Sequence, residues 1–348
     1  FYMIRILENV NIDWLAKRRI FLSISVLLLL SGLASALVRQ LSGKEPFNLG
    51  VDFRGGTVVT AKFKQRPTDD AIRAALARVG VGDAVVQPVL SKQDEFLIKL
   101  AQQGSSEEAQ SQAQVDIGRT KVTDALSSFG SEGDAWSIIG TEAVGPVAGR
   151  QLRNQAITVT LLALVGILLY IAFRFEWTYG AAAVITVFHD VLVTLSFFSI
   201  FQWEVNLTVI AALLTLVGFS VNDTIVTFDR IRENLRLHRR DSLYKITNDA
   251  INQTLSRTII TGGLVFLSVL ALVLFGGEVL RGFSLALFVG VIVGTYSTIA
   301  IASPIMVWLQ KRLDSSRAQP SPANATGARR QTTSSNTRKE KAGAAAVR

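Results

Sequence analysis

Residues 207–228 form an almost wholly apolar run that is long enough to cross a lipid bilayer as one helix. Such a helix needs about 20 apolar residues at about 1.5 Å rise each. Asn222 and Asp223 interrupt the run shortly before its charged exit at Asp229. A carboxylate inside a membrane helix costs at least ~2.5–3.5 kcal/mol on insertion scales, so it is retained where it has a partner or a function. Asp223 is therefore the first functional candidate.

Five further apolar runs predict a chain that crosses the membrane six times, at residues 20–38, 155–173, 179–201, 257–275 and 282–309. The composition agrees, because 49% of the 348 residues are hydrophobic and the mean hydropathy is +0.36. These values are typical of a membrane protein with one extramembrane domain. The run at 20–38 also resembles a secretory signal that ends at Ala34-Ser35-Ala36, but an uncleaved anchor is favoured since further spans follow. The absence of cysteine excludes a disulfide scaffold and a thiolate metal site.

Basic residues indicate how the chain is oriented in the membrane. With a cytoplasmic N-terminus, every predicted cytoplasmic segment carries Lys or Arg, namely the amphipathic lead-in 1–19, the connection 174–178, the loop 229–256 and the tail 310–348. The outer connections at 202–206 and 276–281 carry a single basic residue, Arg281. This asymmetry predicts that both termini are cytoplasmic and that residues 39–154 lie outside the cytoplasm. It also accounts for most of the net charge of +9, so no specific binding of nucleic acid is expected.

Two polar segments outside the spans differ in character. Residues 39–154 have the composition of a soluble domain, with predicted strands at 57–63, 84–90, 95–100 and 135–140 and predicted helices at 68–79 and 109–129. The order β-α-β-β-α-β predicts an α+β domain of the ferredoxin-like type. It contains no cluster of metal-ligand type and no phosphate loop, which favours a binding or coupling module.

The tail 310–348 is rich in Ser, Ala, Thr, Arg and Lys and is predicted to be disordered. Three alternatives stay open for the tail: solubility, loose attraction to anionic lipid or a ribosomal surface, or no role.

Polar and small residues within the spans recur at helical spacing. They form one stripe in each of four spans, namely Thr208, Ala211, Thr215, Gly218 and Asn222; Thr186, Asp190 and Thr194; Arg257, Thr261 and Ser268; and Gly290, Gly294, Ser297 and Thr298. Residues three and four apart share one face of a helix. Because polar groups in hydrocarbon need partners, we expect these stripes to face one another inside the bundle.

Asp223 and Arg257 are expected to lie at a similar depth, since one comes late in an inward span and the other begins an outward one. Two interpretations stay open: a static ion pair between two helices, or a protonatable carboxylate with an arginine partner in a water-accessible path. His189 and Asp190 either hold helices together by a hydrogen bond or belong to a proton relay. Asp229 is expected to be a surface charge. No nucleophile–base pair and no nucleotide-binding loop is evident in the sequence, so the chain is not expected to be an enzyme, and neither a cofactor nor a metal is expected.

Several motifs together resemble the SecD/SecF family of bacterial protein-export membrane proteins, on its SecF side. They are Val221-Asn222-Asp223-Thr224-Ile225-Val226 with Phe228-Asp229-Arg230-Ile231-Arg232-Glu233, Gly50-Val51-Asp52-Phe53-Arg54-Gly55-Gly56, Phe173-Arg174-Phe175-Glu176-Trp177, His189-Asp190-Val191, Leu255-Ser256-Arg257-Thr258 and Gly145-Pro146-Val147-Ala148-Gly149. The resemblance runs in order from about Asn9 to Leu313. Val51 departs from the isoleucine that the family often has there, and the resemblance does not extend over the basic tail.

The resemblance implies a subunit of the bacterial inner membrane that pairs with SecD beside the SecYEG channel, with YajC and YidC as further candidate partners. Such a complex uses the proton-motive force to pull unfolded secreted chains across the membrane in the late steps of export. The proton-pathway aspartate of the family maps to Asp223 and its arginine partner to Arg257; Asn222, Asp190 and His189 are further candidates. The architecture is similar to half of a resistance-nodulation-division exporter, and membrane lipids are its surroundings. Sodium is an alternative coupling ion.

Two alternatives come from other classes of function. A small-molecule or lipid exporter would share the six-span half but would need a second half and large exit domains. A passive scaffold would only assemble SecD with the channel, and in that case the Asp223–Arg257 pair would be structural. Replacement of Asp223 by Asn separates the scaffold from the proton carrier, because a scaffold should tolerate it.

Overall fold

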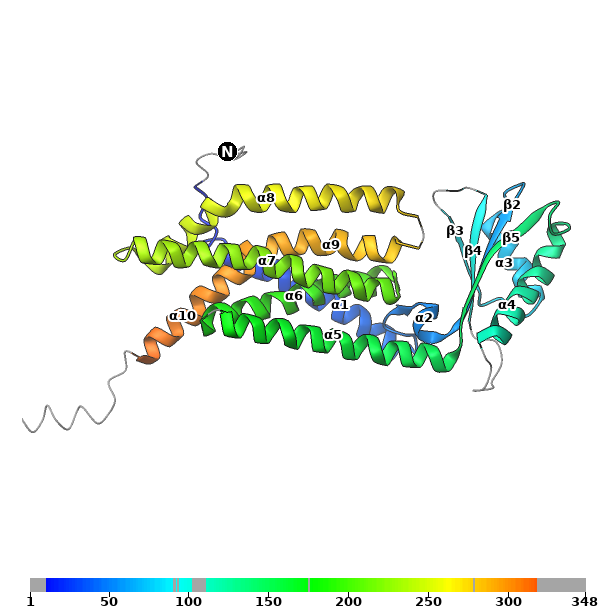
Figure 1. Ribbon diagram of the computed structural model, residues 1–348, viewed down its shortest axis with the longest axis horizontal. Helices are drawn as coiled ribbons and strands as arrows, with labels where there is room; N and C mark the ends of the chain where they lie inside the picture. Colours follow the sequence, from blue (N-terminus) through cyan, green and yellow to red (C-terminus); the bar gives the residue numbers. More distant parts are fainter. Residues whose placement is uncertain are drawn as a thin grey trace, which may run out of the picture.

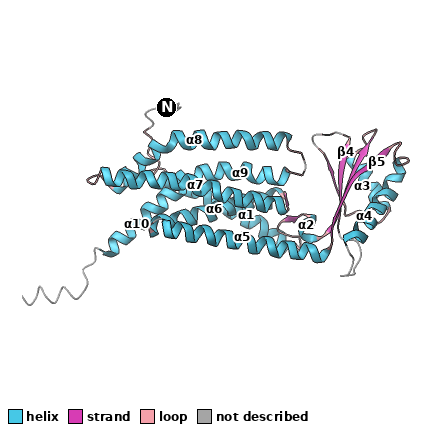
Figure 2. Ribbon diagram, in the orientation of Figure 1, coloured by secondary structure: helices cyan, strands magenta, loops and turns pink. Residues whose placement is uncertain are grey.

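The structure is a computed structural model that describes residues 11–89, 92, 94–101, 111–174, 176–277 and 279–317. It is elongated, with a long helical bundle and a small α+β domain at one end (Figure 1). Residues 1–10 of the predicted lead-in and residues 318–348 of the predicted tail lie outside the described residues, so neither prediction is tested there. Figure 2 separates the two parts clearly, since the four-stranded sheet lies beyond the end of the bundle.

Six helical segments in the described chain are long and apolar enough to cross a membrane, as the sequence predicts. They are α1 (Arg18–Leu41), α5 (Pro146–Arg174), α6 (Trp177–Phe201), α7 (Leu207–Leu237), α8 (Leu243–Phe275) and the continuous segment α9 (Arg281–Ser297), η2 (Thr298–Ala302) and α10 (Ser303–Arg317). The side chains of α6, α7 and α9 are largely buried, whereas those of α1, α5 and α8 are mostly exposed. Helices α6, α7 and α9 thus form the centre of the bundle.

The predicted loop 229–256 is almost entirely helical in the structure. Helix α7 continues to Leu237, and α8 begins at Leu243, where the side chain of Ser242 accepts a hydrogen bond from the backbone N–H of Lys245 at 3.3 Å. The second half of this predicted loop, from Leu243 onward, is therefore the first part of α8. Hydropathy marks where a span leaves the apolar layer, but a helix ends only where its backbone finds a cap or a breaker.

The α+β domain has the predicted order of elements. Its sheet contains β2 (Gly56–Phe63), β3 (Val85–Pro88), β4 (Glu95–Ala101) and β5 (Trp136–Val144) in the order β3-β4-β2-β5, with every neighbouring pair antiparallel. Helix α3 (Asp69–Arg78) follows β2, and α4 (Ser111–Leu126) with the turn η1 (Ser127–Phe129) follows β4. Thr68, where the predicted helix 68–79 begins, caps α3 by accepting from the N–H of Ala71 at 3.3 Å. Leu90 and residues 109–110 of the predicted elements lie outside the described residues.

One face of this sheet is covered by the two helices (Figure 1). Alternate residues of β2, namely Val59, Ala61 and Phe63, are fully buried and pack in a core with Ile72 of α3 and Val122 of α4. Side chains alternate between the two faces of a strand, so this spacing of two aims one apolar set at the helices. The core of the domain is thus separate from that of the bundle.

Residues 48–56 join the domain to the bundle. Strand β1 (Asn48–Leu49) pairs in parallel with β6 (Glu204–Val205), and the short helix α2 (Val51–Arg54) follows β1. Gly55 and Gly56 have φ angles of 77° and 142°, values that L side chains rarely adopt. The two glycines therefore allow the chain to turn from α2 directly into β2.

The same junction caps the central helix α7. The carboxylate of Asp52 accepts from the N–H of Leu207 at 3.0 Å, and Oδ1 of Asn206 accepts from the N–H of Val209 at 3.1 Å. The first N–H groups of a helix have no partner within it, so these two side chains satisfy donors at the start of α7. An ion pair between Lys99 of β4 and Glu204 of β6 adds a direct link from the sheet to the bundle.

Candidate functional site within the helical bundle

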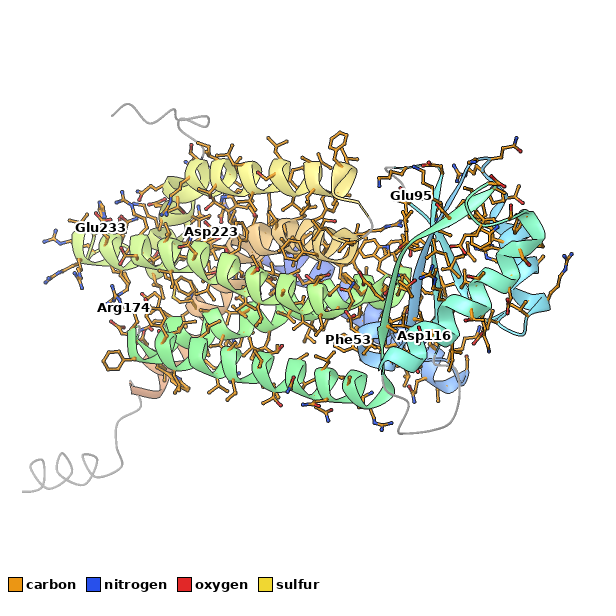
Figure 3. The ribbon with its side chains drawn as sticks, turned by 45° about the vertical axis from the view of Figure 1, so that its right-hand side comes forward. Phe53, Glu95, Asp116, Arg174, Asp223 and Glu233 are labelled. Carbon is orange, nitrogen blue, oxygen red and sulfur yellow. The ribbon has the colours of Figure 1, made fainter. Side chains whose placement is uncertain are left out.

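Asp223 lies on α7 in the part of the bundle away from the α+β domain (Figure 3). Its side chain is buried, and Oδ1 accepts a hydrogen bond from the hydroxyl of Thr258 on α8 at 2.9 Å. Its other oxygen, Oδ2, is buried and has no hydrogen bond of ordinary geometry among the described residues, although the hydroxyl of Thr298 is near enough to act on the carboxylate. A buried carboxylate oxygen without a donor is costly, which makes this position the least satisfied charge site of α7.

A direct ion pair between Asp223 and Arg257, one of the two interpretations that the sequence left open, is not formed. Within the described part of the chain, no contact of 4.0 Å or less joins their charged atoms, although Arg257 is near enough to act on Asp223 electrostatically. The residue that contacts Asp223 is Thr258, the next one along α8. Neighbouring residues point about 100° apart around a helix, so with Thr258 aimed inward, Arg257 is exposed on the outside of the bundle.

The stripe of small and polar residues on α7 also faces outward, contrary to the prediction. Ala211, Thr215, Gly218 and Asn222 are all exposed, while Ser220, Thr224 and Thr227 on the opposite side are buried. The buried side packs against α6, α8 and α9 (Figure 1). Helical spacing showed which residues share a face of α7. Helical spacing does not show which face of α7 is covered by the other helices of this chain.

Asp190 on α6 is the centre of a second polar cluster. It is fully buried, and its Oδ2 accepts from the hydroxyls of Ser220 on α7 at 2.5 Å and Ser297 on α9 at 2.7 Å. Its Oδ1 lies 2.9 Å from Nδ1 of the adjacent His189, whose Nε2 is buried without a partner among the described residues. The predicted stripe of α6 thus faces inward as expected, and Asp190 joins three helices.

Ser220 was not identified from the sequence as a site residue. A lone serine within an apolar run gives little signal, because serine often bonds to its own helix backbone. A sign of its role was available, however, since Ser220 is three residues before Asp223 and therefore lies on the same side of α7.

A π-helical turn, η2, interrupts the last membrane segment beside these clusters. It begins at Thr298, whose hydroxyl lies 3.2 Å from that of Thr224 on α7, directly after Ser297 of the Asp190 cluster. Such turns are rare and occur frequently at functional sites. The turn places Ser297 and Thr298, adjacent in sequence, between the two carboxylates.

The two clusters together can hold or pass a proton inside the bundle. Asp223 and Asp190 are both buried, and hydroxyls of Ser220, Thr224, Ser297 and Thr298 lie around and between them. Carboxylates and hydroxyls are the groups that membrane proteins use for proton relays. Among the described residues no three His, Cys, Asp or Glu side chains are grouped so that they could hold a metal ion.

Comparisons with known proteins agree with this architecture. Residues 123–312 match the family "Protein export membrane protein SecD/SecF, C-terminal", and residues 42–65 match the "SecD/SecF GG Motif". The chain is 38% identical to "Protein translocase subunit SecF" of Koribacter versatilis, over 87% of this chain and 93% of the relative. It is also 38% identical to the SecF subunit of Gemmatimonas aurantiaca, over 89% of this chain and 90% of that one.

Two solved structures share the fold. The chain superposes on the crystal structure of SecDF from Thermus thermophilus, described as a translocon-associated membrane protein, with a TM-score of 0.73, 35% identity and 87% of this chain covered. A second SecDF structure, in its super-membrane-facing form, gives a TM-score of 0.63 at 34% identity over 90% of this chain. The chain spans only 39% and 40% of those two longer chains. With its six apolar helices, this multi-pass membrane protein belongs to the SecF branch of the SecD/SecF family of protein-export membrane proteins.

Proposed function

We propose that this chain works with SecD beside the SecYEG channel and uses the proton-motive force to drive late steps of protein export. The observation that carries the proposal is Asp223, a buried carboxylate with one unsatisfied oxygen in the centre of a six-helix bundle. If a buried carboxylate had only a structural role, both of its oxygens would be expected to have hydrogen-bond partners, as those of Asp190 do. Family membership supports the role in export.

The exposed stripe on α7 supports SecD as a membrane partner. Thr215, Gly218 and Asn222 on α7 and Arg257 on α8 are exposed in this chain, although they lie on helices long enough to span the membrane. Polar and charged side chains facing lipid are costly, whereas small residues allow another helix to approach closely. A SecD helix on this face would cover Asn222 and supply Arg257 with acceptors next to Asp223.

The α+β domain is then the output of the cycle. Its strand order and antiparallel pairing are those of a ferredoxin-like module, and we place it outside the cytoplasm, with both chain termini inside. Asp52 and the Lys99–Glu204 pair connect it to the start of α7, the helix that carries Asp223. Each proton that crosses ~100 mV supplies about 2.3 kcal/mol, enough to bias two packings that differ by a few kcal/mol.

The wider surroundings follow from this placement. The clients are unfolded polypeptides emerging from SecYEG, and YajC and YidC are further candidate partners in a bacterial inner membrane. The coupling ion is the proton, with sodium as the alternative. The cluster of hydroxyls and carboxylates around Asp190 and Asp223 has chemistry that suits either ion, so the ion dependence of export decides between them.

The test is completion of export in inverted membrane vesicles, after the ATP-driven start, with and without a proton gradient. Asp223→Asn should abolish the gradient-dependent part while SecD still co-purifies at the wild-type level. Asp229→Asn, six residues later on the exposed end of the same helix, is the matched control and should retain it. If Asp223→Asn vesicles keep gradient-stimulated export, Asp223 is not the proton site, and the site is then Asp190 or a residue of the partner subunit.

A further inference from the structure

A groove on the bundle surface lies between the first and last membrane helices, at the end opposite to the α+β domain. It has a volume of about 320 Å³, within the size range of small-molecule sites, and its apolar wall includes Leu22 of α1 and Ile305 and Trp308 of α10. Leu15, which is fully buried, lies at its base. None of these residues belongs to the Asp190 and Asp223 clusters.

Two cations lie at the same end of this groove. The groove is lined by residues from the start of α1 and by residues between 304 and 311 of α10, whereas the end of α10 extends away from the bundle (Figure 1). Arg18 precedes Leu22 by one helical turn, and Lys311 follows Trp308 by about one turn. Both side chains line the groove, both are exposed, and neither has an ion pair of 4.0 Å or less within the described chain.

The local backbone adds to the positive character of this end. Helix α1 begins at Arg18 with no acidic residue in its first turn and no side-chain cap at Lys17, so an anion at this helix start would be favoured. On the other side, the guanidinium of Arg312 lies 4.3 Å from the centre of the Trp308 ring. A half-exposed tryptophan beside basic residues is typical of the level where lipid headgroups meet the acyl chains.

We propose that this groove binds one anionic phospholipid, with its phosphate between Arg18 and Lys311 and an acyl chain against Leu22, Ile305 and Trp308. The combination of two cations that form no ion pair of 4.0 Å or less within the described residues and an apolar wall fits a molecule that is anionic at one end and a hydrocarbon at the other. A soluble phosphate would leave the apolar wall uncovered, and a zwitterionic lipid would bring its own ammonium group next to the two cations, so only an anionic lipid neutralises them. Basic pockets between membrane helices are a known way of holding such headgroups.

Bound lipid would hold the first and last membrane segments together at this end. The last segment contains the π-helical turn and Thr298, so the lipid would contact the same helix that borders the Asp223 site, through its far end. The site is independent of the proposed export function, because it depends only on the groove and its two cations.

Native mass spectrometry of the full chain in detergent tests the proposal, with dioleoylphosphatidylglycerol as the anionic probe and dioleoylphosphatidylcholine as the neutral one. The double variant Arg18→Gln/Lys311→Gln should bind the anionic probe roughly 10- to 30-fold more weakly. The matched control Lys44→Gln/Arg153→Gln removes two exposed cations near the domain end and should bind it within about twofold of wild type. Equal binding by both double variants would overturn the proposal, as would equal binding of the two lipids by the wild type.

A second measurement checks the acyl-chain half of the site without changing any charge. In nanodiscs, phosphatidylglycerol brominated on its acyl chain should quench the fluorescence that Trp308 contributes, obtained by subtracting a Trp308→Phe variant, and Arg18→Gln/Lys311→Gln should remove this quenching. Millimolar glycerol 3-phosphate should leave the quenching unchanged. Competition by glycerol 3-phosphate would show that the cations bind free phosphate and that the lipid assignment is wrong.

Discussion

Asp190 and Asp223 lie on neighbouring helices, but their carboxylates accept very different numbers of hydrogen bonds. Asp190 accepts from two serine hydroxyls and interacts with His189, whereas Asp223 accepts one bond, from Thr258. Hydrogen bonds to charged groups contribute about 1.5–3 kcal/mol each, and removing one partner also leaves the others unsatisfied. Asp190→Ala should therefore destabilise the chain by about 3 kcal/mol or more, and Asp223→Ala by about 1–2 kcal/mol. Thermal unfolding followed by tryptophan fluorescence compares the two, and equal losses would contradict this division of roles.

The sequence predicted these residues unequally well. Asp223 and Asp190 stand out because a carboxylate in an apolar run has a known cost, and that cost also predicted that Asp190 is buried inside the bundle. The partners were harder to predict. Ser220 gives no signal by itself. Whether Arg257 or Thr258 faces Asp223 depends on how α8 is rotated about its axis, and this rotation is set by helix packing rather than by composition.

The first turns of helix α8 are hydrogen-bonded to Ile12 and Asp13, in the segment that precedes α1. Asn248 and Asn252 both donate to the carbonyl of Ile12, and Tyr244 donates to Asp13 at 2.6 Å. That hydrogen bond, followed by one from the N–H of Ala16, lowers the pKa of the Asp13 carboxyl. A carboxyl whose pKa is lowered in the folded state stabilises that state at pH values above its ordinary pKa of about 3.9. This stabilisation is lost as the pH falls through the lower folded-state pKa.

Acidification should therefore loosen this segment only below about pH 4. The fluorescence that Trp14 contributes, obtained by subtraction of a Trp14→Phe variant, should change in that range in the wild type. Asp13→Asn should lack the acid-dependent step, because its side chain does not titrate. Asp249→Asn changes another carboxylate of α8 and should keep the step; loss of the step in both variants would assign it to a different group.

Helix α7 is the element through which the domain and the buried site are connected, and Asp52 caps its start. Loss of such a cap typically costs about 1 kcal/mol. Asp52→Ala should therefore speed hydrogen exchange in the first turn of α7, at residues 207–211, while Asp52→Asn should retain protection because an amide oxygen also accepts. Glu45→Ala, which removes an exposed ion pair with Arg54 in the same junction, is the control and should leave exchange at 207–211 unchanged.

At the scale of the whole molecule, the six spans and the order of elements in the α+β domain followed from the sequence, because apolar runs and strand alternation have fixed lengths and periods. The burial of one helix face against another did not. A stripe of small and polar residues has the same spacing whether it packs within the chain or against another protein. The outward position of Thr215, Gly218 and Asn222 is the information that only the assembled bundle provides.

This outward stripe leads to a prediction about assembly. A Cβ atom added at Gly218 would meet no atom within 4 Å in this chain, so Gly218→Val should leave the thermal stability of the isolated subunit within about 0.5 kcal/mol of wild type. If the stripe is the SecD face, the added methyl groups would hold the partner helix away, and SecD recovered by co-purification should fall severalfold. Gly166→Val on α5 is the matched control, since its added Cβ would also meet no atom within 4 Å. It should retain SecD fully. Undiminished recovery with Gly218→Val would show that SecD binds elsewhere and that Arg257 finds its counter-charge in another way.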